Sequence, residues 1–398
     1  MAFSSHHGGR HYHASLELQT VSEPSISRPA GSSTGVKSRQ DYTVLLPHEV
    51  FWRDHQQWLA ERGYMLRPRY RPDWVASYKD KQDYPWDCED SVASLHSFLL
   101  DATRISDGEV VILKKVFRQR NPYEIDMNRC FSSEPFKSHP RNHCVQIIDV
   151  LAVPDDEDIS IMVMPLLRRC DDPRFETIGE VMEFLRQVFE GMQFLHQCHV
   201  AHCDCMDLNI MMDPKPMFPD LYHPMSKTMS REFTDEAKKP YTRTARPPKY
   251  YIIDFGLSLR FSPDDMNPLA EPVQGGDRTV PEFQNSDGPQ NPFPTDIYYL
   301  GNMVRETFLE KTMGLEFLKP LVDDMVQDDP TKRPTIDEVV ERFGKVLRSL
   351  HWWNLRKRLV ENIEAEDAMK RFRRRWRHFF RTVGYTLTFK SPLPVPRY

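Results

Sequence analysis

The sequence predicts an α+β fold, in which a small sheet-rich half with one helix precedes a larger helical half. Runs of β-branched and other apolar residues, bounded by turn residues, occupy much of residues 84–167. Apolar residues at helical spacing dominate residues 168–350. The chain has 398 residues, which is enough for two modest domains or one domain with two lobes.

The composition is that of a globular protein, with 39% apolar and 28% charged residues. A net charge of −5 argues against general nucleic-acid binding, and no specific nucleic-acid partner is predicted. No apolar run approaches the roughly 20 residues of a membrane helix, and the first residues lack the pattern of a signal peptide. Seven cysteines suit reduced thiols better than a disulfide framework. We therefore expect a cytoplasmic or nuclear protein that is not secreted and has no transmembrane segment.

The sheet-rich half is preceded by two segments of different composition. Residues 1–40 are rich in Ser, Gly, Pro and His without periodicity, which predicts a disordered arm. Residues 41–83 form an N-terminal extension, in which the spacing of apolar residues over 50–59 predicts a helix.

Turn signals divide the sheet-rich half. Two β-rich runs flank the turn residues 106–108, which predicts a hairpin. Asn121, followed by Pro122 and by Glu124 three residues after the cap, predicts the start of a helix. Two further strands are expected over 144–153 and 159–167, joined by an acidic turn.

The helical half begins with a wide apolar stripe over 177–199, which predicts a long helix. Residues 213–249 are rich in Pro, Lys, Thr and Met and are expected to be an inserted loop. An apolar strand follows and ends in the turn "DFG". Further helices are expected over 296–309, 315–326 and 335–350.

A stretch at the end of the long predicted helix contains six possible metal ligands. Zinc sites usually take pairs such as Cys-x-x-Cys from separated elements, whereas these six residues crowd one helix end and loop. Cysteine is also among the most buried residue types, so thiols that pack in the core are the better interpretation. The six residues are His196, Cys198, His199, His202, Cys203 and Cys205.

Four residues in a particular chain order carry the chemistry. Lys114 lies in the predicted strand "VVILKKV", and Asp204 precedes Asn209 by five residues in "DCMDLN". Asp254 follows in "DFG". A phosphate-pairing lysine, a base and two metal-binding groups in this order are the parts of a protein-kinase site. The sequence resembles the eukaryotic protein-kinase-like superfamily, and in detail the kinase-like proteins of mushroom-forming fungi.

The resemblance covers about residues 84–350 and implies a bilobal protein-kinase-like fold. The kinase N-lobe would span 84–167 and the C-lobe 168–350, with the insertion 213–249 and a basic aromatic tail over 351–398. The implied function is transfer of the ATP γ-phosphate to Ser or Thr of a protein substrate. ATP, Mg²⁺ and an unidentified substrate protein are the implied partners.

The resemblance also implies roles for single residues. Lys114 would pair the ATP phosphates, and Glu124 would orient it unless Glu124 merely completes a capping box. Asp204 would accept or position the substrate hydroxyl proton, while Asn209 and Asp254 would hold Mg²⁺. The remaining cofactor-binding residues would be Met164 and Leu166, beside adenine, and Ser94 and Ser97, in the phosphate loop.

Three further motifs match structural parts of the family. Glu282 in "VPE" closes the segment that starts at Asp254, and Arg333 in "DPTKRPT" would pair with it. Asp296 in "TDIYYLG" would be the buried acid of a central helix. A buried Arg–carboxylate pair is a structural device, so neither Glu282 nor Arg333 is expected to act in catalysis.

The chain also departs from the family. It has no Gly-x-Gly-x-x-Gly, and at family spacing this loop falls on 92–99, where Ser94 and Ser97 replace glycines. Cys203 stands in place of the arginine of His-Arg-Asp, and Met206 in place of a lysine. Loss of a cation beside the transferred phosphoryl lowers transition-state stabilisation. A pseudokinase that acts as a nucleotide-binding or scaffold module without catalysis is therefore the alternative.

The tail contains a basic amphipathic pattern in "KRFRRRWRHFF". Its aromatic residues recur at i, i+4, i+7 and i+8 with arginines around them. Such a helix suits an acidic membrane, a groove on a protein partner or a nuclear address, and it could also pack on the helical half with its arginines in solvent. The aromatic residues are Phe372, Trp376, Phe379 and Phe380.

Overall fold

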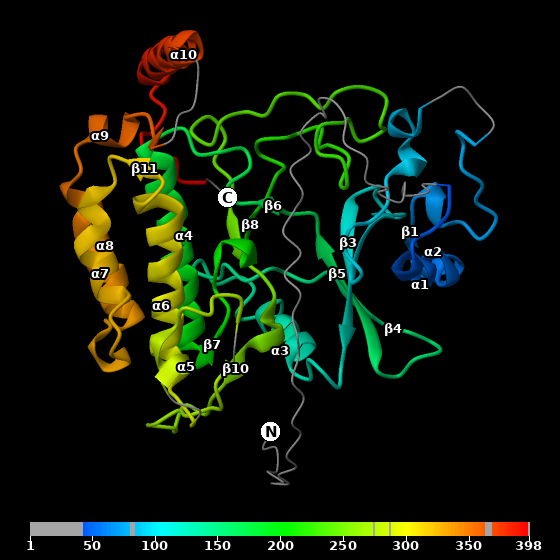
Figure 1. Ribbon diagram of the computed structural model, residues 1–398, viewed down its shortest axis with the longest axis horizontal. Helices are drawn as coiled ribbons and strands as arrows, with labels where there is room; N and C mark the ends of the chain where they lie inside the picture. The colour runs from blue at the N-terminus through cyan, green and yellow to red at the C-terminus, as the bar shows by residue number, and fades with distance from the viewer. Residues whose placement is uncertain (1–42, 80–83, 274, 286–287, 363–367, 397–398) are drawn as a thin grey trace, which may run out of the picture. The chain divides into compact units, whose positions relative to one another are not determined.

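The computed structural model describes residues 43–79, 84–273, 275–285, 288–362 and 368–396 (Figure 1). The predicted disordered arm, 1–40, lies outside the described residues. Over the described part the chain combines a curled antiparallel sheet with helices, so the predicted α+β class is confirmed.

The main sheet has five antiparallel strands in the order β1-β2-β3-β5-β4. The predicted hairpin between β2 and β3 is confirmed, and its turn uses Gly108 at φ +73°, where glycine carries no steric penalty. The Gly108 N–H donates to the Arg104 carbonyl at 2.8 Å. The strands are β1 (Tyr64–Met65), β2 (Leu99–Arg104), β3 (Val110–Phe117), β4 (Asp149–Ala152) and β5 (Ile159–Pro165).

The segment that precedes β2 in sequence contributes a strand to the main sheet. The helices α1 (Val50–Asp54) and α2 (Gln56–Glu61) lead into β1, which pairs with β2. Trp52 and Leu59 are fully buried in the same apolar cluster as β2, β3 and β5 residues. Residues 41–83, expected as an extension, therefore supply an edge strand and core side chains.

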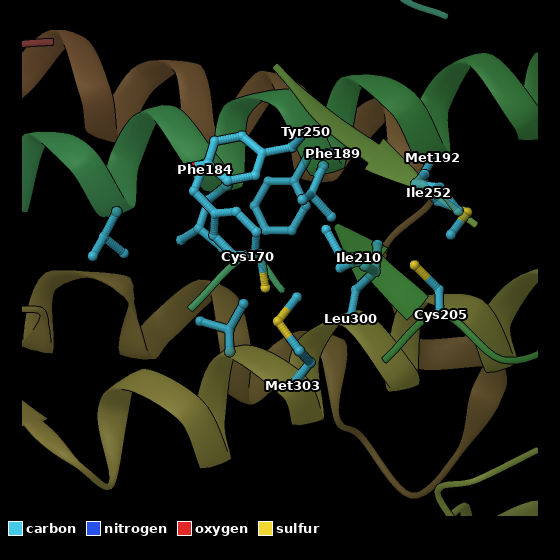
Figure 2. Close-up of a cluster of buried hydrophobic side chains, with 14 of the residues drawn as sticks. Cys170, Phe184, Phe189, Met192, Cys205, Ile210, Tyr250, Ile252, Leu300 and Met303 are labelled. Atoms are coloured by element: carbon cyan, nitrogen blue, oxygen red, sulfur yellow. The ribbon is translucent and has the colours of Figure 1, made fainter. Parts of the chain in front are cut away.

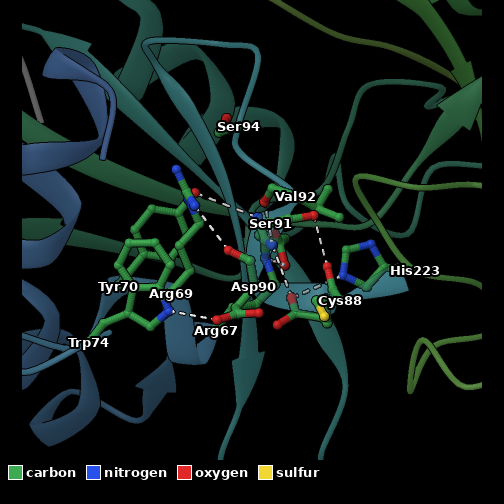
Figure 3. Close-up of polar contacts among 12 residues, drawn as sticks. Arg67, Arg69, Tyr70, Trp74, Cys88, Asp90, Ser91, Val92, Ser94 and His223 are labelled. Carbon is green, nitrogen blue, oxygen red and sulfur yellow. Dashed lines mark hydrogen bonds and ion pairs between the residues drawn. The ribbon is translucent and has the colours of Figure 1, made fainter. Parts of the chain in front are cut away.

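Residues 66–98 connect β1 to β2, and buried charges fix the parts of this connection that the structure describes, 66–79 and 84–98 (Figure 3). Arg69 donates to both oxygens of Glu49, at 3.0 and 2.9 Å, and both side chains are buried. Arg67 pairs with Asp101 on β2 at 3.0 Å and with Glu89 at 3.0 Å. Because each guanidinium is matched by a carboxylate, the described parts of the connection hold their shape with only short 3₁₀ turns between β1 and β2.

The helix of the sheet-rich half, α3, spans Glu124–Phe131. The prediction that Asn121 caps it is wrong, since the helix begins after Tyr123 and has no side-chain cap. The Asn121 side-chain amide instead donates to the Gly256 carbonyl at 3.1 Å. Asn121 is thus used in a long-range contact with the "DFG" turn.

The helical half is built around α4 (Ile178–Gln197), whose cap Thr177 accepts the Glu180 N–H. Its apolar face packs with α6 and with strands β8 and β9, as Figure 2 shows for Phe184, Met192 and Leu300. The other helices are α5 (Pro281–Asn285), α6 (Pro292–Val304), which continues as a π-helical turn over Arg305–Leu309, α7 (Lys319–Met325), α8 (Ile336–Ser349), α9 (Trp352–Arg356) and α10 (Ala368–Leu387).

Short strands position the loops of the helical half. These strands form one small sheet, in the order β6-β8-β9, and two pairs, β7–β10 and β11–β12. All neighbouring strands in them are antiparallel. Their bounds are β6 (Arg168–Arg169), β7 (Val200–Ala201), β8 (Ile210–Met212), β9 (Tyr250–Ile252), β10 (Leu259–Arg260), β11 (Thr312–Met313) and β12 (Val360–Glu361).

The inserted segment 213–249 is anchored at its end. Arg243 is buried and donates to the Cys170 carbonyl at 2.6 Å and to the Tyr250 hydroxyl at 3.0 Å. Thr244 donates to the buried Glu180 carboxylate of α4 at 2.8 Å. The insertion therefore packs on the helical half as part of its structure.

Candidate functional site

Lys114 lies at the centre of a three-residue ionic cluster. It projects from β3, where the register pairs it with Leu99 on one side and Met162 on the other. Its Nζ lies 2.6 Å from Glu124 Oε1 and 2.9 Å from Asp254 Oδ1. Burial works to lower the pKa of Lys114, but the Asp254 and Glu124 carboxylates outweigh it and raise the pKa. The ammonium group is therefore held charged between two acids.

Glu124 is buried at the first turn of α3 and contacts Lys114. Burial raises the pKa of Glu124, and the Lys114 ammonium opposes that effect. The alternative that Glu124 completes a capping box does not hold, because Tyr123 occupies the cap position and makes no side-chain cap.

Asp254 follows β9 in a left-handed backbone conformation, at φ +66°. Such a conformation is uncommon for residues other than glycine and is enriched at functional sites. The neighbouring Phe255 is buried and packs against the rings of Phe131 and His202. Partial burial works to raise the pKa of Asp254, but Lys114 outweighs it and lowers the pKa. The carboxylate is thus ionised at neutral pH.

The loop that carries Asp204 is set by a buried carboxylate of α6. Asp296 accepts the His202 N–H at 2.7 Å and the Cys203 N–H at 2.8 Å. The His202 ring nitrogen lies 3.0 Å from the Ile253 carbonyl, which ties the loop to the residue before Asp254. The loop and the "DFG" turn are therefore fixed relative to each other.

Both oxygens of Asp204 have hydrogen-bond donors within the chain. Asn209 donates its side-chain N–H to Oδ2 at 2.7 Å and to the Asp204 carbonyl at 2.8 Å. The Gly276 N–H donates to Oδ1 at 2.7 Å. Burial raises the pKa of Asp204, the Gly276 N–H works against it, and the charge of Asp254 raises it further.

The Gly276 contact depends on a neighbouring glycine. A Cβ atom at Gly275 would lie 2.5 Å from Asp204 Oδ1 and 2.8 Å from the Cys203 carbonyl oxygen. Only a residue without a side chain fits so close to the acid. At Gly276 a Cβ would meet the Met206 sulfur, which is the far end of a flexible side chain. Sequence reasoning did not assign this glycine pair, and its only signal was a Gly-Gly turn pattern.

The predicted site residues fall into two contact groups. Lys114, Glu124 and Asp254 form one, and Asp204 with Asn209 forms the other. The two groups influence each other electrostatically through Asp254 and Asp204. The remaining predicted residues, Met164 at the end of β5 and Leu166 just beyond it, are half-buried and buried respectively.

The structure corrects the expectation for Ser94. Its side chain is fully buried, and its hydroxyl lies 2.9 Å from the Leu99 carbonyl and 3.1 Å from the His96 carbonyl. Its N–H donates to Glu49. Because these groups are satisfied inside the β1–β2 connection, Ser94 does not offer them to a phosphate. Ser97, also predicted in that loop, is half-buried in an irregular segment.

The second half of the stretch rich in His and Cys packs in the core, whereas His196, Cys198 and His199 are half-buried. Cys205 is fully buried (Figure 2), Cys203 is buried, and burial raises the pKa of both thiols. His202 is also fully buried and contacts the chain as described above. Within the described ranges, no three His, Cys, Asp or Glu side chains gather in a group that could hold a metal ion.

Comparison with protein-family models finds no match, and neither does comparison with curated protein sequences. Among the helices in the described part of the chain, none has the length and apolar character needed to cross a bilayer. The site is therefore interpreted from its own geometry.

Proposed function

We propose that the chain is a protein-kinase-like phosphotransferase that moves the γ-phosphate of ATP to Ser or Thr of a protein. The observation that carries the proposal is the position of Lys114 between Glu124 and Asp254. A strand lysine held by a helix glutamate, beside the aspartate of a "DFG" turn, is the arrangement that phosphoryl transfer uses in kinases. The bilobal kinase fold is part of this proposal.

Two further relationships support the fold proposal. Arg333 donates to both oxygens of Glu282, at 2.8 and 2.6 Å, and both side chains are buried. The Asp296 carboxylate accepts two backbone N–H groups, of His202 and Cys203, from the loop that carries Asp204. The Arg333–Glu282 pair and the burial of Asp296 were expected from the family resemblance, and each contact joins segments far apart in sequence.

The donor atoms present suit ATP and Mg²⁺. Asp254 and Asn209 offer carboxylate and amide oxygens, the hard ligands that Mg²⁺ prefers, and Mg²⁺ usually binds with one or two carboxylates plus phosphates and waters. Asp254 also has a lowered pKa, so it is in the ionised form that a ligand requires. Bound Mg²⁺ would neutralise charge on the phosphates, and Lys114 would pair with them.

Asp204 would act on the substrate hydroxyl. Its carboxylate accepts the hydroxyl proton or orients the oxygen, while Asn209 keeps the side chain in place. Oδ1 already accepts the Gly276 N–H, so an incoming hydroxyl has to share this oxygen and the space around it with residues 275–276. The proposed reaction therefore includes a small displacement of residues 275–276.

A pseudokinase is the second candidate. It is favoured by the same Gly276 contact, because the hydrogen bonds from Gly276 and Asn209 work to lower the pKa of Asp204 and so weaken it as a base. The absence of a cation at Met206 and the internal use of Ser94 also favour it. Such a protein would bind nucleotide through Lys114 without turnover.

The test compares the full chain with Lys114→Met and Asp204→Ala variants. Nucleotide binding is measured by thermal shift, and phosphoryl transfer by ADP release and autophosphorylation with Mg²⁺ or Mn²⁺. Lys115→Met is the matched control, because Lys115 is the adjacent residue of β3 and lies over the Phe51 ring instead of the acids. We expect Lys114→Met to lose nucleotide binding and turnover, and Asp204→Ala to lose turnover alone.

Turnover in wild type that equals turnover in Asp204→Ala would reject the phosphotransferase. Nucleotide stabilisation that persists in that case, and that Lys114→Met removes, would support the pseudokinase. If wild type shows neither nucleotide stabilisation nor phosphoryl transfer, both candidates are rejected.

A further inference from the structure

The helix α10 presents its apolar side chains outward. They recur at i, i+4, i+7, i+8, i+11 and i+15, which places them on one face. Each is exposed, with exposed fractions from 41% to 73%. An amphipathic helix on a globular protein normally buries this face. The residues are Phe372, Trp376, Phe379, Phe380, Val383 and Leu387.

The opposite, polar face attaches α10 to the rest of the chain. Arg381 pairs with Glu176, which lies just before α4, and the Tyr385 hydroxyl is 2.5 Å from the Thr242 hydroxyl. The half-buried positions also follow a helical period, at i, i+4, i+7, i+8 and i+11. They are Arg374, His378, Arg381, Thr382 and Tyr385. The helix α10 therefore contacts the helical half, as one expected alternative has it, but through its polar face, which leaves the apolar face exposed.

Two tryptophans of α9 extend the apolar surface. Trp352 and Trp353 are 50% and 60% exposed, and with Phe379, Val383 and Leu387 they line a cavity of about 480 Å³. Figure 1 draws α10, in red, beyond the end of α9. Tryptophan suits a site where one end is apolar and the other meets water, as at a membrane interface.

The charge on α10 has one sign. The helix contains seven Lys and Arg residues and no Asp or Glu, although the whole chain has a net charge of −5. Arg373, Arg375 and Arg377 are exposed around the apolar face. An anionic plane can pair with the exposed arginines on both flanks of the apolar face, whereas a protein groove would need acids matched to each one.

We propose that α10, together with Trp352 and Trp353, binds the surface of an anionic phospholipid bilayer. The aromatic face enters the boundary between headgroups and acyl chains, and the arginines pair with the lipid phosphates and carboxylates. The helix lies in the plane of the surface, because its exposed apolar face extends from Phe372 to Leu387. This proposal does not depend on phosphotransfer.

Co-sedimentation of the full chain with lipid vesicles tests the proposal. One set contains phosphatidylcholine alone, and in the other about a quarter is phosphatidylserine. We expect binding to the anionic vesicles only. We also expect release as salt rises from about 0.1 M to about 1 M, since the Debye length falls from about 10 Å to about 3 Å.

Two variants separate the apolar and electrostatic parts. Phe372→Ser with Trp376→Ser and Phe380→Ser should weaken binding by at least roughly tenfold. Arg373→Gln with Arg375→Gln and Arg377→Gln should weaken it by roughly a hundredfold, whereas the three Arg→Lys changes should retain it. Melting temperatures should stay unchanged, because these side chains are already exposed.

A control variant alters exposed apolar residues elsewhere. Trp86→Ser with Leu95→Ser and Phe389→Ser removes side chains that are 68%, 83% and 94% exposed and lie outside α9 and α10. It should bind anionic vesicles as wild type does. The proposal would be overturned if wild type bound neutral and anionic vesicles equally. It would also be overturned if this control lost as much vesicle binding as the α10 variants. Absence of vesicle binding by the folded chain would overturn it as well, including the case in which light scattering shows that the α10 face joins two copies.

Discussion

Cys203 donates its backbone N–H to Asp296 Oδ1 at 2.8 Å, across 93 positions of sequence. The adjacent His202 N–H donates to the other oxygen, so one buried carboxylate fixes two consecutive peptide units. Cys203 has a φ of +65°, a conformation that costs an ordinary residue about 1–2 kcal/mol. The two hydrogen bonds to Asp296 offset this strain and aim Asp204, the next residue.

We expect Asp296→Asn to unfold more easily and to lose phosphoryl transfer. An amide offers one acceptor oxygen in place of two, so one buried N–H is left without its partner, at a cost of about 1–3 kcal/mol. Urea unfolding measures the change. Asp323→Asn, at a surface pair with Lys319, is the control and should change little. A similar loss in both variants would contradict this account of Asp296.

Gly275→Ala should raise turnover. Its Cβ cannot lie 2.5 Å from Asp204 Oδ1, so residues 275–276 must shift and the Gly276 N–H must leave the acid. Removal of a competing charge-assisted hydrogen bond should favour substrate access by roughly tenfold. Gly276→Ala is the matched control, since it only has to move the Met206 side chain. Unchanged steady-state turnover of Gly275→Ala would show that this contact does not limit the reaction.

The pH–rate profile should have its acid limb above the ordinary Asp pKa of 3.8. Burial raises the pKa of Asp204, and the base must be ionised, so activity falls as the pH drops through that raised pKa. The Gly276 N–H lowers this pKa, so Gly275→Ala should move the limb to higher pH. A limb that lies in the same place in both proteins would argue that another group controls it.

Glu282→Gln should destabilise the helical half by about 3–5 kcal/mol, because it leaves the buried Arg333 charge without its partner. Burial works to raise the pKa of Glu282, but Arg333 outweighs it and lowers the pKa. The stabilisation is therefore present above the unfolded-state pKa of about 4.5 and is lost as the pH falls through the lower folded-state pKa.

Thermal unfolding of wild type and Glu282→Gln between about pH 3 and pH 7 measures this dependence. Their stabilities should converge at the acid end. Glu341→Gln, which breaks a surface pair with Lys345, is the control and should follow wild type throughout. If the stability difference between wild type and Glu282→Gln were the same at every pH, the Arg333–Glu282 pair could not be its source.

Local patterns predicted the regular elements well. The apolar stripe of α4 is confirmed, and so is the helix expected over 335–350, which is α8. The β2–β3 hairpin is confirmed as well. In these elements the signal lies within a few residues, because spacing and turn chemistry decide the conformation before tertiary contacts form.

The incorrect predictions concern residues whose partners lie far away in sequence. Asn121 has the pattern of a cap, yet its amide contacts Gly256. Ser94 was placed by family spacing, whereas Glu49 and Leu99 hold it inside the β1–β2 connection. For the candidate site, Lys114 and Asp204 were predicted from the sequence and remain predictions, whereas the Gly276 contact requires the three-dimensional path of residues 275–277.

The buried charges around residues 66–98 make three distant parts of the chain one cooperative unit. A cation or acid cannot leave this network without exposing an unpaired partner, so its segments open together. Backbone amides in the irregular β1–β2 connection should therefore exchange with solvent as slowly as those of the neighbouring sheet. The unit includes a residue of the insertion, since His223 lies 3.2 Å from Glu89. Its members are Glu49, Arg67, Arg69, Glu89, Asp101 and His223.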